Sequence, residues 1–98
     1  MSGALGREVA QALRRSAAAA GMTITATVTA ERGWASALFE GTRFSLTLAS
    51  EGAEFDGWLA TLPEADLPLR RCFIASAEVI DRTTPGTARV EILAVAEA

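Results

Sequence analysis

The stretch MTITATVTA, residues 22–30, decides the class of fold, because apolar and polar side chains alternate along it without a break. Threonine fills the polar positions from Thr23 to Thr29, and the alternation has the period of two that is typical of a β-strand with one buried face. Threonine is β-branched and is common in strands. The stretch therefore predicts a strand that packs one face against a core.

Two other segments have their apolar residues at the helical period of about 3.6 residues. One precedes this strand, and the other lies further along the chain. Residues 4–20 are rich in alanine, the best helix former, and residues 53–62 end at Pro63, which cannot continue a helix. The apolar residues that recur at helical spacing are Leu5, Val9 and Leu13 in the first segment and Phe55, Trp58, Leu59 and Leu62 in the second. We therefore expect two helices, the second of them short.

Four more strands are predicted, two between the helices and two after the second helix. Gly41-Thr42 suits a two-residue hairpin turn, and Pro85-Gly86 suits a type II turn. Residues 31–33 are predicted as the turn that follows the first strand. The predicted strands are residues 34–40, 43–50, 71–81 and 87–97.

This order of elements predicts an α+β fold in a single domain, residues 1–98. We expect one five-stranded, mostly antiparallel sheet with both helices on one face. Short connections favour the strand order third, second, first, fifth, fourth. The alternative places the fourth strand beside the third, in parallel, through a right-handed crossover.

The composition argues against most catalytic chemistry. The 98 residues include no histidine and no lysine, so imidazole bases and Schiff-base lysines are excluded. No spacing resembles a metal-binding loop, so we expect no catalytic residues, no metal and no cofactor, and we do not expect an enzyme. Exclusive use of arginine together with abundant alanine is typical of a GC-rich, bacterial-type genome.

The charge and the cysteine content indicate which partners to expect. Twelve acidic against nine basic residues give a net charge of −3, which argues against nucleic acid as a partner. Cys72 is the single cysteine, so no internal disulfide can form. The sequence has no long apolar segment, so we expect no membrane partner and a cytoplasmic location.

The second face of the predicted sheet is half apolar, which predicts a small, non-catalytic interaction or assembly protein. We expect a homodimer, or a complex with a protein partner, through this face. An alternative is that the first helix covers the same face and makes a three-layer monomer. The residues predicted at this interface are Ile74, Ile80, Leu93 and Val95, with charged neighbours as a rim.

A second functional hypothesis is a small-ligand binding domain, with a pocket between the second helix and the sheet. Trp34 and Trp58 would stack against a planar ligand, and Arg70 or Arg71 would hold an anionic group. The thiol of Cys72 stands next to the two arginines and could react only if it were activated.

Overall fold

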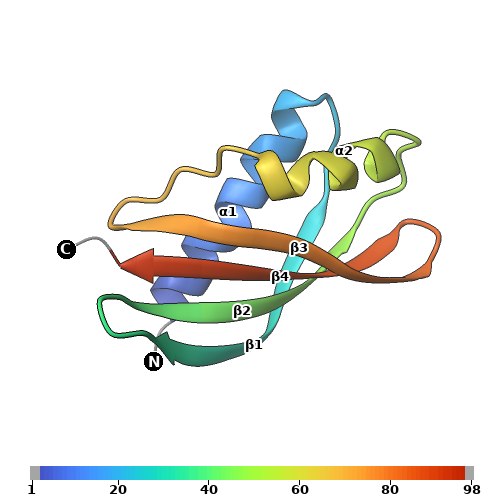
Figure 1. Ribbon diagram of the computed structural model, residues 1–98. Coiled ribbons are helices and arrows are strands. Elements are labelled where there is room, and N and C mark those ends of the chain that lie inside the picture. Colours follow the sequence, from blue (N-terminus) through green and yellow to red (C-terminus); the bar gives the residue numbers. More distant parts are fainter. Residues whose placement is uncertain (1–2, 97–98) are drawn as a thin grey trace.

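The chain folds into two helices and four strands, which a computed structural model describes for residues 3–96, apart from the side chains of Thr83 and Thr84. The predicted α+β class, with an N-terminal helix, a short second helix and an antiparallel sheet, is confirmed. The sheet has four strands rather than five, and Glu97, which ends the predicted last strand, lies outside the described residues. In chain order the elements are α1 (Gly3–Ala19), β1 (Thr25–Ala35), β2 (Glu40–Ala49), α2 (Phe55–Thr61), a 3₁₀ turn at Leu62–Glu64, β3 (Cys72–Thr84) and β4 (Thr87–Ala96) (Figure 1).

One long strand, β1, replaces the first two predicted strands, so the turn expected at residues 31–33 is wrong. The chain turns at residues 36–39 instead. The backbone N–H of Ser36 donates to the carbonyl oxygen of Phe39 at 2.8 Å, and the N–H of Phe39 donates to the Oγ of Ser36 at 3.2 Å. The serine side chain thus supplies the turn chemistry for which the sequence suggested a glycine.

Gly41 was predicted to form a hairpin turn, and it lies inside β2 instead. It pairs with Trp34 on one side and Val95 on the other. A Cβ atom at this position would run into the carbonyl oxygen of Ala94 on the neighbouring strand. The close approach of β4, rather than a turn, therefore requires glycine here.

The strand order is β1-β2-β4-β3 with every pairing antiparallel, so the predicted order and its parallel alternative are both wrong. The two central strands, β2 and β4, lie side by side with most of their apolar residues on the same face of the sheet. Each of the pairs Phe44–Ile92, Leu46–Val90 and Leu48–Ala88 joins residues that are at most 1% exposed. Central placement buries more apolar surface than an edge position would, which explains why β4 inserts beside β2.

Both helices pack against one face of the sheet and share a single buried cluster with it. Gly6 of α1 faces the sheet, where a Cβ would lie 3.5 Å from Val28 Cγ2 and 3.6 Å from Phe44 Cε1, in ordinary van der Waals contact. The cluster includes Val9, Leu13 and Ala17 of α1, Phe55, Trp58 and Leu59 of α2, and Phe44, Leu46, Leu48, Val90, Ile92 and Ala94 of the sheet.

Irregularities in β3 change which of its side chains face the helices. The register shifts at Ala75 and again at Ile80. Ile74 packs against the core, while Phe73 is paired with Val95 on the other face. The sequence pattern placed Ile74 on the second face, because a strict period of two does not anticipate the extra residue of a bulge.

Candidate functional site

The sheet face turned away from α1 and α2, called here the open face, is covered by no helix of the described residues 3–96 (Figure 1). One row of paired residues crosses it near the β1–β2 turn: Trp34, Gly41, Val95 and Phe73. The rings of Phe39 and Phe73 meet edge to face, with centroids 6.5 Å apart. Phe39 is 47% exposed, Phe73 42% and the neighbouring Leu38 85%. We call Trp34, Leu38, Phe39 and Phe73 the apolar end of the open face.

Charged side chains of both signs lie among serines and threonines on the rest of the open face. Arg32 of β1 is paired with Arg43 of β2, and Glu91 of β4 is paired with Glu78 of β3. Arg89 of β4 lies on the same face. Arg43 and Glu91 meet across the centre, where Nη1 and Oε1 are 3.8 Å apart. At that length the ion pair is loose, and both groups remain available to a partner.

The four predicted interface residues do not form one patch. Leu93 and Val95 lie on the open face, but neighbouring side chains leave them only 8% and 3% exposed. Ile74 packs against the core on the covered face. Ile80 is 46% exposed and lines a shallow depression beside α2. The side chains exposed at the apolar end are instead contributed by a turn and by the start of an edge strand.

The two tryptophans lie in different parts of the fold. Trp58 is 5% exposed in the core, stacks on Phe55 with ring centroids 6.2 Å apart, and donates from Nε1 to the Oγ of Ser16 at 3.0 Å. Trp34 stands on the open face, opposite Gly41. The structure therefore does not bring the two indoles together around a pocket between α2 and the sheet.

Arg70 and Arg71 line a groove of about 910 Å³ between α1 and the segment that leads into β3. The structure brings Arg7 and Arg14 of α1 to the same groove, and we call these four residues with their surroundings the basic groove. The backbone N–H of Arg70 donates to a carboxylate oxygen of Glu8 at 2.6 Å, which holds the two walls together. The other lining residues are Ala4, Leu5, Gln11 and Cys72.

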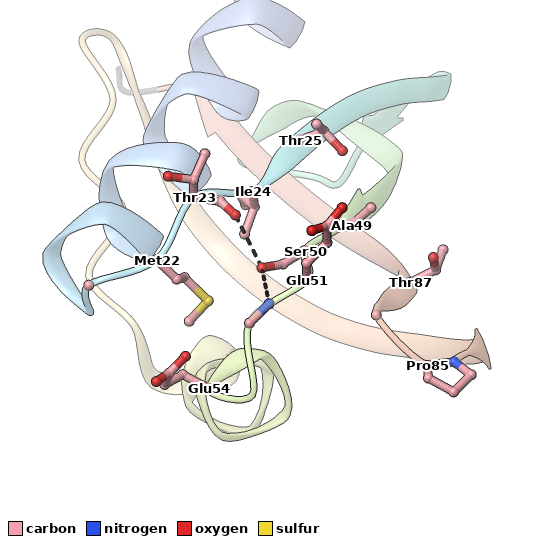
Figure 2. A pocket seen from close by; sticks show the side chains of 13 residues that line it. Met22, Thr23, Ile24, Thr25, Ala49, Ser50, Glu51, Glu54, Pro85 and Thr87 are labelled. Carbon is pink, nitrogen blue, oxygen red and sulfur yellow. Dashed lines mark hydrogen bonds between the residues drawn. The ribbon is translucent and has the colours of Figure 1, made fainter.

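Figure 2 shows a further depression, of about 630 Å³, where the links α1–β1 and β2–α2 meet the β3–β4 turn. Hydrogen bonds of Ser50 connect these segments. Its Oγ donates to the carbonyl oxygen of Thr23 at 3.1 Å and accepts from the N–H of Gly52 at 3.2 Å, and its N–H donates to the carbonyl oxygen of Gly86 at 2.9 Å. We interpret this depression as a junction of loops, because its serine is occupied with backbone groups.

No group of three or more acidic, cysteine or histidine side chains among residues 3–96 is placed to hold a metal ion. None of the helices described there has the length and apolar character needed to cross a membrane. No family model matches the chain, and searches of curated proteins and of solved structures find no significant similarity.

Proposed function

We propose that this chain is a non-catalytic interaction module that assembles with a second copy of itself through the open face. The observation that carries the proposal is the apolar end, where Phe39 and Phe73 remain 47% and 42% exposed on a face that no described helix covers. Large apolar side chains gathered on one surface are typical of contact sites.

The open face is large enough for a dimer. Four strands about 4.8 Å apart make it about 19 Å wide, and the ten residues of β4 make it about 33 Å long. Each copy would then bury about 600 Å², and the pair about 1,200 Å². This total is at the lower end of the range for specific and stable interfaces.

The face is also complementary to itself. A twofold axis parallel to the strands sets β1 of one copy over β3 of the other, and β2 over β4. Trp34 then meets Phe73 of the second copy. The apolar row is therefore matched across such an isologous contact.

The same axis brings unlike charges together. Arg32 and Arg43 come over β3 and β4 of the second copy, where Glu78 and Glu91 stand one row away, about 7 Å along the strand. Complementary charge next to an apolar contact favours the correct pairing of the two surfaces.

The experiment is sedimentation velocity of the wild type and of two matched variants in the same strand. Phe73→Glu places a charge in the apolar end, and Ile80→Glu places one at a similarly exposed position outside it. We expect a dimer for the wild type and for Ile80→Glu, and a folded monomer for Phe73→Glu. A wild type that stays monomeric at about 100 µM, or a Phe73→Glu variant that stays dimeric, would refute the proposal.

A further inference from the structure

The basic groove concentrates positive charge in a chain that is acidic overall. The net charge of the chain is −3, and four of its nine basic residues line this one groove. Among the described residues 3–96, Glu8 is the single acidic one that lines it, and one of its oxygens already accepts the N–H of Arg70. The described lining therefore carries three positive charges more than negative ones.

The guanidinium groups of the groove are available to a ligand. The salt bridges described within residues 3–96 use Arg43 and Arg82, and neither of these lines the groove. The bond described for a groove guanidinium runs from Arg14 Nη2 to Gln11 Oε1, at 2.9 Å, and leaves its other donors open. Like charges held close together repel each other, so a bound anion would relieve the repulsion.

The spacing of the arginines indicates the length of the ligand. Arg7 and Arg14 are seven residues apart on one helix, which places them about 10.5 Å apart along its axis. Arg70 and Arg71 form the facing wall. A single small anion cannot reach all of these positions, whereas a chain of linked anionic groups can.

The chemistry of the lining favours phosphate. A guanidinium group binds a phosphate through two parallel N–H···O bonds, and these charge-assisted bonds are about twice as strong as neutral ones. None of the residues within 3–96 that line the groove is aromatic, so this lining offers no surface on which a nucleobase would stack. We infer that the basic groove is a binding site for an extended phosphate anion with several linked phosphate groups and no base. This inference is independent of the proposed self-assembly.

Calorimetric titration with inorganic tripolyphosphate and with orthophosphate, at constant ionic strength, tests the inference. We expect tripolyphosphate to bind at least about tenfold more tightly than orthophosphate. The double variant Arg14→Gln/Arg71→Gln should weaken tripolyphosphate binding by about tenfold or more. The control Arg32→Gln/Arg89→Gln removes the same charge outside the groove and should leave the affinity within about twofold.

A further variant tests the sign of the electrostatic effect. Glu8→Gln removes the negative charge from the groove but keeps an oxygen that can accept the N–H of Arg70. We expect tripolyphosphate to bind this variant more tightly than the wild type. Thermal unfolding of each variant confirms that it is folded.

Several results would overturn the inference. These are the absence of saturable tripolyphosphate binding in the millimolar range, equal affinity for orthophosphate, or equal weakening in the control variant. A short glutamate peptide that binds more tightly than tripolyphosphate would also overturn it, because the groove would then be a carboxylate site.

Discussion

Replacing Gly41 with alanine tests the strand pairing on which the open face depends. A Cβ at Gly41 would run into the carbonyl oxygen of Ala94 and lie 3.1 Å from the Cα of Val95. Both are backbone atoms in the centre of the sheet, so neither can move without disturbing the pairing of β2 with β4. Overpacking of this kind costs about 1–3 kcal/mol of unfolding free energy.

Gly33 provides the matched control, because it lies in the same hairpin and a Cβ there meets no atom within 4 Å. Gly33→Ala restricts the unfolded chain and should leave stability unchanged or raise it by up to about 1 kcal/mol. The two variants should therefore differ by about 1–4 kcal/mol, which is about 4 °C or more in Tm for a domain of this size.

Thermal unfolding followed by circular dichroism measures the difference directly. The assay compares Gly41→Ala, Gly33→Ala and the wild type at equal protein concentration, because self-association would also raise Tm. If Gly41→Ala unfolds at the same temperature as Gly33→Ala, then β4 does not lie against Gly41, and the row that forms the apolar end is wrong.

Three further substitutions test other contacts of the fold. Ser16→Ala removes the acceptor of the Trp58 Nε1–H, which is then left without that partner in the core, and urea unfolding should show a loss of about 1–3 kcal/mol. Gly86→Ala should lower Tm, because Gly86 has a φ of 82° and a Cβ there would lie 2.6 Å from the carbonyl oxygen of Ser50. The expected loss of unfolding free energy is about 1–3 kcal/mol. Gly57→Ala should act in the opposite direction, because Gly57 lies in α2 with open space around it, and calorimetry should show a gain of up to about 1 kcal/mol.

The elements with an uninterrupted hydrophobic period could be predicted from the sequence. The helices were found because Leu13 and Trp58 belong to regular apolar series, and both residues are buried. The turn at Pro85-Gly86 could be predicted because proline has a fixed φ, which suits the second position of the turn, and glycine tolerates the positive φ of the third position. Each of these signals lies within a few residues along the chain.

The positions that were predicted wrongly depend on contacts between distant segments. In the sequence, the pair Gly41-Thr42 resembles a hairpin turn. Only the contact with Ala94 in the folded chain shows why glycine is needed at position 41, inside a strand. The bulge at Ala75 reverses the sheet faces on which Phe73 and Ile74 lie, compared with a regular strand. The sequence around Ala75 contains no signal that predicts this bulge. Strand order is likewise decided by how well β2 and β4 match, which is a property of two segments about 45 residues apart in the chain.

The basic groove illustrates the same limit for a site. The pair Arg70-Arg71 stands out in the sequence, whereas Arg7 and Arg14 look like ordinary exposed residues of an alanine-rich helix. They become part of one site only because α1 packs on the covered face and Glu8 ties it to the segment before β3. Since α1 forms one wall of the groove and lies on the side of the sheet opposite the open face, a second copy on the open face leaves this wall accessible. An anion bound in the groove and a partner bound on the sheet would therefore not compete for the same surface.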